Sequence, residues 1–443
     1  MHIFNGILII FLGTYLLLSF SRSFISIYSL LIIKLILPVG IYFIYSGNYF
    51  ENNLLASFWI LFLFGSIFGF KLGLRSKLIK NLVQKTSAIK KFRITRNHLS
   101  KLLNFAFYSN LLHLLITIIL SFLQTDNDAF QGTNISVLTK SNPLIYLISI
   151  SLRWSSIISI FSSKYISNRS NFKTNNLIFK ILLLFVFTEY ITSFQFVSDT
   201  SLTSYANKLF QPLLFILYYK FFDANHIGLL KKIFSLRLSK KLIGIIVLIF
   251  VFLAAIITFS SIFLGDPIGY WAFKFASRVD GYLFLNSEML DKLSRNYNNI
   301  FAYIAHPFLK LIGLYGYKAP MGTFLLSSIL DTDIAKTIGG PNIHLPILIG
   351  ITYLNMSMSF LIIPFMLILF SGIFGLALSY SYKILWDKNN IFSISQSFIS
   401  LFIYFSTMRF ITEPSVFSHS LMAFICCFVI YKFISKVSFR SVM

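Results

Sequence analysis

Two cations and a tyrosine share one face of a predicted helix in the stretch WAFKFASRVDGYLFLNSEML, residues 271–290. Lys274, Arg278 and Tyr282 are spaced four residues apart, so a helix would align their side chains on one face. Two cations one turn apart repel each other unless an anion lies between them. A phosphate or diphosphate would resolve that repulsion, and the planar fork of arginine suits it through paired hydrogen bonds. The spacing is compatible with two interpretations, an anion site and an ordinary solvated helical face.

Four residues could act as a base that takes a proton from a hydroxyl group. Arg409 and Glu413 lie four residues apart in MRFITEPSVFSHS. They either stabilise a helix end or provide a second phosphate-binding cation and a general base. His306, His344 and Asp280 are the other candidates, because the pKa of histidine is naturally near neutral and a carboxylate can accept a proton. The sequence does not rank the four bases.

The composition excludes an ordinary soluble domain, because 56% of the 443 residues are hydrophobic and only 12% are charged. Runs of about twenty apolar residues recur, and each could cross a bilayer core of roughly 30 Å as a helix. Barrel strands would instead alternate every second residue. The predicted fold class is therefore all-α, a polytopic integral membrane protein. The first run lacks a basic leader and a small-residue cleavage site, so we expect a retained span rather than a signal peptide.

The distribution of Lys and Arg predicts how the chain crosses the membrane. The connection 71–101 contains ten cations and no acid, which is typical of a cytoplasmic loop. Alternation then places the N-terminus outside and the C-terminus inside, within one domain of residues 1–443. The predicted spans, about eleven in all, cover residues 3–20, 25–46, 54–74, 102–123, 144–163, 177–196, 207–222, 242–264, 355–384, 391–410 and 416–436.

One predicted external connection, residues 265–342, is far longer than the others and carries mixed charge. Long loops are usually functional, and a structureless loop of this length would be unusual. Two pairs of opposite charges four residues apart support a helix over 271–295, and an amphipathic helix is expected over 300–316. A third short helix is expected over 322–330. The following region, 342–384, has room for a re-entrant piece as well as a span.

Two opposite charges lie inside predicted spans. Arg153 is near the middle of the fifth span and Glu189 is in the sixth, which runs antiparallel to it. Their depths match, and burying either charge alone would cost roughly 2.5–3.5 kcal/mol, so we expect them to pair. The pair either fixes two helices or lines a substrate cavity. His113, in the fourth span, is expected to form a bond between helices rather than to bind a ligand.

The net charge of +24 does not indicate a nucleic-acid partner, because the cations fall mainly in short loops between spans. The two cysteines, Cys426 and Cys427, are adjacent in an apolar run and form neither a disulfide framework nor a metal site. The P-loop and paired-glycine fingerprints of nucleotide-binding proteins are absent. We therefore expect no nucleic acid, no metal and no cofactor.

Three stretches carry a resemblance to a known family. They are SRVDGYLFL (277–285), IGGPNIHLPILIGITYLN (338–355) and FVSDTSLTSYANKLFQPLLFILYYKF (196–221). Together with about eleven spans and a large external loop in the last third, they resemble the O-antigen polymerases (the Wzy family) of Gram-negative surface-polysaccharide clusters. The family counterpart of the third stretch often carries an arginine, where this chain has only Lys208. The R-x10-G pattern of some members is also missing, because Met289 stands eleven residues after Arg278.

The resemblance implies a metal-independent, inverting glycosyltransferase at the periplasmic face of the bacterial inner membrane. It would pass the growing chain from undecaprenyl diphosphate to the non-reducing-end hydroxyl of an incoming lipid-linked repeat, and a chain-length regulator would be a partner. Preorganised cations would stabilise the departing diphosphate, and a base would take the proton of the acceptor hydroxyl. The candidate cations and their neighbour are Lys274, Arg278, Tyr282 and Arg409, and the candidate bases are Asp280, His306 and Glu413.

Three other activities remain open. An O-antigen ligase uses the same donor in a similar layout, and an acyltransferase could also work at the external face. A flippase for lipid-linked oligosaccharide belongs to a different class. Transporters often show two related halves with broken helices, and no such halves are found in this sequence.

Overall fold

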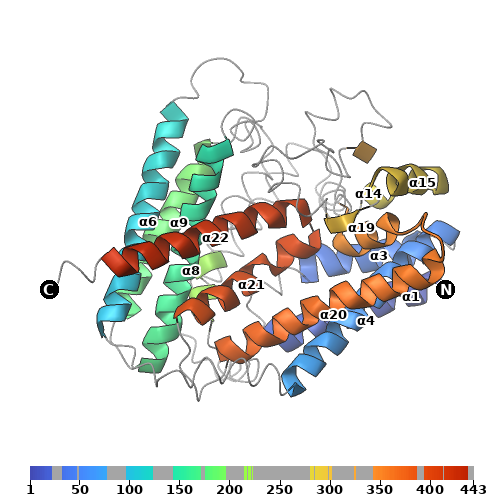
Figure 1. The fold of residues 1–443 in the computed structure, drawn as a ribbon, viewed down its shortest axis with the longest axis horizontal. Coiled ribbons are helices and arrows are strands. Elements are labelled where there is room, and N and C mark those ends of the chain that lie inside the picture. The colour runs from blue at the N-terminus through green and yellow to red at the C-terminus, as the bar shows by residue number, and fades with distance from the viewer. Residues whose placement is uncertain are drawn as a thin grey trace, which may run out of the picture. The chain divides into compact units, whose positions relative to one another are not determined.

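In a computed structural model of the chain, all regular structure within the described residues is helical (Figure 1). These residues are 1–21, 32–46, 49–76, 96–122, 143–170, 175–195, 214–216, 218–220, 222, 280–283, 285–297, 299–301, 324–325, 343–386, 394–412 and 414–437. Among them, four helices are long and apolar enough to cross a membrane: His2–Phe20, Phe50–Arg75, Leu99–Ile119 and Ser359–Trp386. The chain is therefore a helical membrane protein. The count of about eleven spans stays a prediction, and the predicted span 242–264 lies outside the described residues.

The helices group into two compact units. Unit 1 comprises Met1–Phe20, Tyr28–Arg93 and Phe275–Val429. Unit 2 comprises Ser21–Ile27, Ile94–Lys274 and Ile430–Met443. The helices of unit 1 are α1 (His2–Ser21), the π-helical turn η1 (Ile32–Ile36), α3 (Leu37–Tyr45), α4 (Phe50–Arg75), α14 (Asp280–Leu283), α15 (Ser287–Asn296), α19 (Leu345–Thr352), α20 (Ser359–Trp386), α21 (Ile394–Thr412) and most of α22 (Pro414–Val437).

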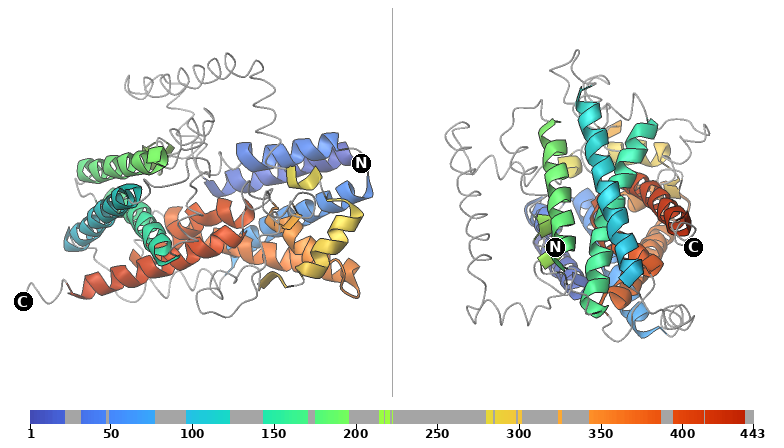
Figure 2. Two further views of the ribbon diagram at one scale, coloured as in Figure 1. Left: turned by 90° about the horizontal axis from the view of Figure 1, so that it is seen from above. Right: turned by 90° about the vertical axis from the view of Figure 1, so that its left-hand side faces the viewer.

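Unit 2 contains three long helices that pack against one another (Figure 2). They are α6 (Arg96–Phe122), α8 (Pro143–Ser170) and α9 (Asn175–Gln195). Serines on α8 are buried along much of its length, and several return a hydrogen bond to the carbonyl four residues earlier, as Ser155 does to Ser151 at 2.7 Å. Small hydroxyl side chains let helices approach each other closely in a membrane. This packing positions the predicted charge pair.

The core of unit 1 is the contact between α4 and α20, which lie side by side (Figure 1). Both helices carry small residues four apart, Gly65 and Gly69 on α4 and Ser371 and Gly375 on α20. A Cβ atom added at Gly69 would lie 2.9 Å from the Cα of Gly372, closer than side chains approach a backbone. The two backbones are therefore in direct contact, as in helix pairs with the GxxxG pattern.

The two helices also run in the same direction. Gly69 of α4 meets Gly372 of α20. Further along both helices, four residues on in α4 and eleven on in α20, the ammonium of Lys383 donates to the carbonyl of Gly73 at 2.9 Å. Lys383 thus binds a carbonyl near the C-terminal end of α4, where helix carbonyls lack partners within the helix. The predicted alternation of spans requires the same parallel orientation for these two helices.

A short buried helix precedes α20. α19 has eight residues, all of them buried, and about 12 Å of helix cannot cross a bilayer core of roughly 30 Å. The chain then turns at 353–358, where Met358 has a φ of 62°, before α20 begins at Ser359. The predicted start of the span, residue 355, is therefore four residues before the start of α20. α19 is a short helix within 342–384, the region for which the sequence allowed a re-entrant piece as well as a span.

The continuous helix predicted over 271–295 is wrong. The chain is extended at Asn286, with φ −83° and ψ 174°, and the side-chain oxygen of Asn286 accepts the backbone N–H of Met289 at 2.8 Å. Asn286 is thus an N-cap that begins α15, and it separates this helix from the single turn α14. The two predicted pairs on α15 do form, Glu288–Lys292 at 2.7 Å and Asp291–Arg295 at 2.8 Å. Nearly all of the predicted helices 300–316 and 322–330 lies outside the described residues.

The orientation of the chain can be tested by cysteine labelling. We expect Ser287→Cys, exposed at the start of α15, to react with an impermeant reagent in intact cells, because it lies in the predicted external segment. Ala88→Cys, in the cation-rich connection 71–101, should react only after the membrane is permeabilised. Cys426 and Cys427 are first replaced by serine. Reaction at position 88 but not at 287 in intact cells would reverse the orientation.

Candidate functional site

Tyr282 attaches the predicted external segment to the helices of unit 1. Its side chain is only 2% exposed, and its hydroxyl accepts the indole N–H of Trp59 from α4 at 2.8 Å. The same hydroxyl makes a short hydrogen bond with Nδ1 of His344. The ring of Phe43 stacks on Tyr282 with centroids 5.9 Å apart, and that of Tyr42 meets it edge-on at 5.4 Å. We call Trp59, Tyr282 and His344 the aromatic anchor.

The hydroxyl of Tyr282 is the group that Trp59 and His344 share in the aromatic anchor. Burial raises the pKa of the Tyr282 hydroxyl well above its ordinary value, so the hydroxyl stays protonated at neutral pH. This hydroxyl accepts from Trp59 and forms its second hydrogen bond with Nδ1 of His344. His344 stands at the N-cap of α19 without a side-chain cap bond, so its ring is directed to Tyr282 instead.

Removing the hydroxyl of Tyr282 is expected to loosen this anchor. In Tyr282→Phe the buried indole N–H of Trp59 loses its acceptor, and Nδ1 of His344 loses its hydrogen-bond partner, so stability should fall by about 1–3 kcal/mol. Tyr45→Phe is the matched control, because Tyr45 is 84% exposed. Unfolding of the purified variants in detergent by titrated denaturant measures the difference. Equal stability of the two variants would show that the hydroxyl bonds contribute nothing.

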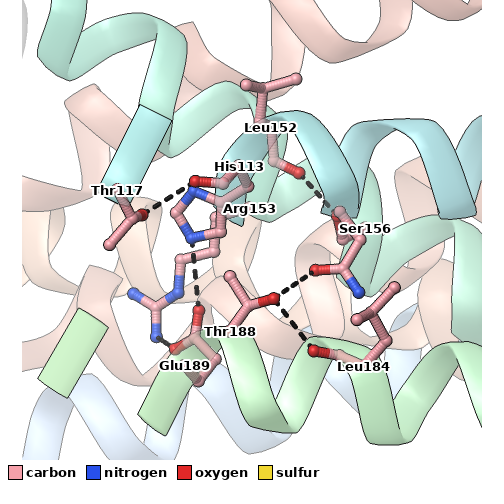
Figure 3. Close-up of polar contacts among 9 residues, drawn as sticks. His113, Thr117, Leu152, Arg153, Ser156, Leu184, Thr188 and Glu189 are labelled. Carbon is pink, nitrogen blue, oxygen red and sulfur yellow. Dashed lines mark hydrogen bonds and ion pairs between the residues drawn. The ribbon is translucent and has the colours of Figure 1, made fainter. Parts of the chain in front are cut away.

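A second polar cluster lies in unit 2, where Arg153 of α8 and Glu189 of α9 are in contact (Figure 3). Nη2 of Arg153 donates to Oε2 of Glu189 at 2.6 Å, and the side chains are 30% and 8% exposed. His113 of α6 points to the other carboxylate oxygen from 3.7 Å, longer than a hydrogen bond. We call Arg153, Glu189 and His113 the charged triad. It joins three helices through one carboxylate.

Polar neighbours hold the helices around the charged triad in register (Figure 3). Immediately before Glu189 on α9, Thr188 donates to the carbonyl of Leu184 at 2.9 Å and lies 3.1 Å from the amide oxygen of Asn110 on α6. Thr117 donates to the carbonyl of His113 at 2.8 Å. Within the described residues neither ring nitrogen of His113 has a hydrogen-bond partner, although both are buried. The triad therefore holds a buried imidazole beside a carboxylate that is already paired.

The remaining predicted site residues do not gather at one place within the described part of the chain. Arg409 donates to the hydroxyl of Ser420 at 2.9 Å and so links α21 to α22 in unit 1. Asp280 begins α14, two residues from Tyr282. The other four candidates, Lys274, Arg278, His306 and Glu413, lie outside the described residues.

Sequence reasoning missed Trp59 and the contact of His113 with Glu189. A tryptophan in an apolar span has no signal that distinguishes a hydrogen-bonding role from simple packing. His344 was considered only as a base, and its bond to Tyr282 was not expected. The signal that could have been used is the isolated polarity of His113 at the depth of the predicted charge pair, because buried ionisable groups in membranes pair with one another.

Neither a metal nor a relative supplies a further clue to the activity. Within the described ranges, no three His, Cys, Asp or Glu residues are arranged to hold a metal ion. In comparisons with protein-family models, characterised proteins and solved structures, none matches the chain. The function must therefore be argued from the chemistry of its residues.

Proposed function

We propose that this protein is an O-antigen polymerase of the bacterial inner membrane. It would transfer a growing oligosaccharide from undecaprenyl diphosphate to the terminal hydroxyl of an incoming lipid-linked repeat, on the periplasmic side, in company with a chain-length regulator. The observation that carries the proposal is the aromatic anchor, which ties the cation-bearing segment to the membrane helices through Tyr282.

The anchor limits how far the cations of this segment can lie from the bilayer surface. Arg278 precedes Tyr282 by four residues, and four residues of chain reach about 14 Å at most. Trp59, the partner of Tyr282, is nine residues into α4, about 13 Å from the start of that helix at Phe50. An anion held by Arg278 would therefore be near the headgroup level of the membrane, where the diphosphate of a polyprenyl lipid resides.

The chemistry assigned to these residues is glycosyl transfer with a diphosphate leaving group. The acceptor hydroxyl gives its proton to a base as its oxygen attacks the anomeric carbon of the donor sugar. The bond from that carbon to the diphosphate oxygen breaks, and the electron pair leaves with the diphosphate. Arg278 and Lys274 would stabilise the charge that develops on the leaving group. Asp280, His306 and Glu413 remain the candidate bases.

Replacing Arg278 is expected to shorten the polymer without removing the protein from the membrane. If the arginine contact strengthens as the bond to the diphosphate breaks, Arg278→Ala should lower turnover more than protein level, leaving mostly single-repeat lipopolysaccharide. Arg278→Lys should restore only part of the ladder, because lysine keeps the charge but lacks the bidentate fork. Gel electrophoresis of lipopolysaccharide at matched expression measures both.

Arg295→Ala is the matched control, since Arg295 is exposed on α15 and pairs only with Asp291 among the described residues. It should leave the ladder intact. A ladder of ordinary length and intensity from Arg278→Ala would contradict the assignment and make Arg409 the next candidate.

A deletion strain separates the enzymatic alternatives on the same gel. Loss of a polymerase leaves lipid core with one repeat, whereas loss of a ligase leaves core without repeats. Loss of an acyltransferase at the external face keeps the full ladder. The single-repeat band is therefore the result that the proposal requires.

A flippase for lipid-linked oligosaccharide is the second candidate, and the charged triad favours it. Ionisable residues inside a membrane bundle often mark transport pathways, and transporters use short or broken helices such as α19. Deletion of a flippase would leave core without repeats, and lipid-linked repeats would accumulate with their sugars inaccessible from the periplasm. Accessibility of these sugars to a periplasmic glycosidase distinguishes the two candidates.

A further inference from the structure

A cavity of about 270 Å³ lies between α1, α4 and α20 in unit 1. Its polar lining consists of three hydroxyl groups and one ammonium, from Tyr15, Ser19, Tyr382 and Lys71. Its apolar wall includes Ile67 and Phe70 of α4. The volume suits a small headgroup better than a drug-sized molecule, because sites for the latter usually exceed about 300 Å³.

The charge of this cavity is positive and uncompensated within the described residues. The ammonium of Lys71 lies 5.2 Å from the ring centroid of Tyr15, and no described carboxylate pairs with it. α1 and α20 contain no acid at all, and the single acid of α4, Glu51, is twenty residues from Lys71, about 30 Å along the helix. A ligand with a negative charge of its own would balance Lys71.

The cavity also lies at the depth of a lipid headgroup. Lys71 and Tyr382 are each four residues from the ends of their helices, about 6 Å from Arg75 and Trp386. Tyrosine and lysine are typical of the boundary between the hydrocarbon core and water. A lysine near a helix end can also extend its ammonium to the water outside the membrane, and that arrangement involves no cavity. Here three hydroxyl donors surround the same space, which is what the oxygens of a phosphate require.

Exposed apolar side chains lie beside the cavity. Phe64, Phe68 and Leu72 are spaced four residues apart on α4, and each is about half exposed or more. They form a row next to the face of the same helix that carries Ile67 and Lys71. This row can lie along acyl chains, which are too large for the cavity itself.

We infer that this cavity binds the phosphate of an anionic membrane phospholipid, with Lys71 balancing its charge and the hydroxyls of Tyr15, Ser19 and Tyr382 donating to its oxygens. The acyl chains would lie outside, along the row Phe64–Phe68–Leu72. The site is separate from the proposed glycosyl transfer, because it lies at the opposite ends of these helices from the start of α4. It favours phosphatidylglycerol over phosphatidylcholine, whose choline group would bring a second cation to Lys71.

The test measures lipid retained by the full-length protein. The protein is reconstituted in nanodiscs that contain phosphatidylcholine and phosphatidylglycerol, extracted in mild detergent and analysed by native mass spectrometry. Lys71→Gln should lower retained phosphatidylglycerol by about fivefold, as expected when one direct ion pair with the phosphate is lost. Arg75→Gln is the matched control, because Arg75 lies one turn away on α4 outside the cavity lining, and it should retain the lipid as the unchanged protein does.

Two further arms make the result decisive. Ser19→Leu keeps Lys71 but fills the cavity, so it should also lower retention of phosphatidylglycerol. Inorganic phosphate added in excess should not displace the lipid, because free phosphate makes no contact with the apolar row. The inference is overturned if Lys71→Gln and Arg75→Gln behave alike, if phosphatidylcholine is retained equally, or if inorganic phosphate displaces the lipid. A circular dichroism melt confirms that each variant is folded.

Discussion

Glu189→Leu is expected to destabilise the protein by about 3–5 kcal/mol, more than the double variant Arg153→Leu/Glu189→Leu does. The carboxylate of Glu189 is nearly buried and holds the guanidinium of Arg153 at 2.6 Å. Removing only the carboxylate leaves the cation without compensation among the helices of unit 2. Removing both charges abolishes the attraction between them and also the cost of burying them. The double variant should therefore recover much of the stability that Glu189→Leu loses.

The experiment is a double-mutant cycle on the purified protein, with unfolding followed in mixed micelles. His113→Leu tests the third member of the charged triad and should cost less, because its ring lies 3.7 Å from the carboxylate. Lys180→Gln on the exposed side of α9 is the charge-removal control and should be near neutral. A double variant no more stable than the worse single variant would contradict a stabilising pair.

Gly375→Ala is expected to destabilise unit 1 by about 1–3 kcal/mol, whereas Gly372→Ala should leave it unchanged or stabilise it. A Cβ at Gly375 would lie 2.6 Å from the backbone nitrogen of Phe70, so α4 and α20 must move apart to admit it. A Cβ at Gly372 meets nothing within 4 Å. The two glycines are three residues apart on the same helix and differ chiefly in this contact.

The same unfolding measurement compares the two alanine variants, and Gly69→Ala provides a check from the opposite helix. Its Cβ would lie 2.9 Å from the Cα of Gly372, so it should be destabilising as Gly375→Ala is. If Gly372→Ala proved as harmful as Gly375→Ala, the loss would come from the helix itself and not from the contact with α4.

Helices that coincide with long apolar runs could be predicted from the sequence. Hydropathy placed the span 54–74 within α4, because crossing lipid requires an uninterrupted apolar helix. It began the next span at residue 355, within the turn that precedes α20, but it did not predict α19 as a helix of its own, since the turn between the two helices contains no glycine or proline. The turn uses Met358 in a left-handed conformation, which sequence patterns assign to glycine or asparagine. Asn286 did carry a usable signal, because asparagine is a favoured N-cap residue.

One charge pair of the candidate site could be predicted from the sequence, but the orientation of its side chains could not. Matched depth was enough to predict the contact of Arg153 with Glu189, because an unpaired charge in lipid is costly. Spacing predicted that Lys274 and Arg278 share a face with Tyr282, and these two residues lie outside the described part of the chain. Spacing did not predict which way the side chain of Tyr282 points. The direction depends on Trp59 and His344, which are 223 and 62 residues away from Tyr282 in the sequence. Only tertiary packing brings such distant residues together.

The glycine contact and the Lys383–Gly73 hydrogen bond have a mechanical consequence for unit 1. With two backbones touching and one end locked, α4 and α20 cannot slide or separate without breaking both, so they move as a single rigid frame. α15 is linked to the turn before α20, where the side-chain amide of Asn355 donates to Asp291 at 2.7 Å. α14 is linked to α4 by the hydroxyl of Tyr282, which accepts from Trp59. If the proposed function requires the charged segment to move for a lipid-linked sugar, that movement would occur at α14 and α15 rather than between α4 and α20.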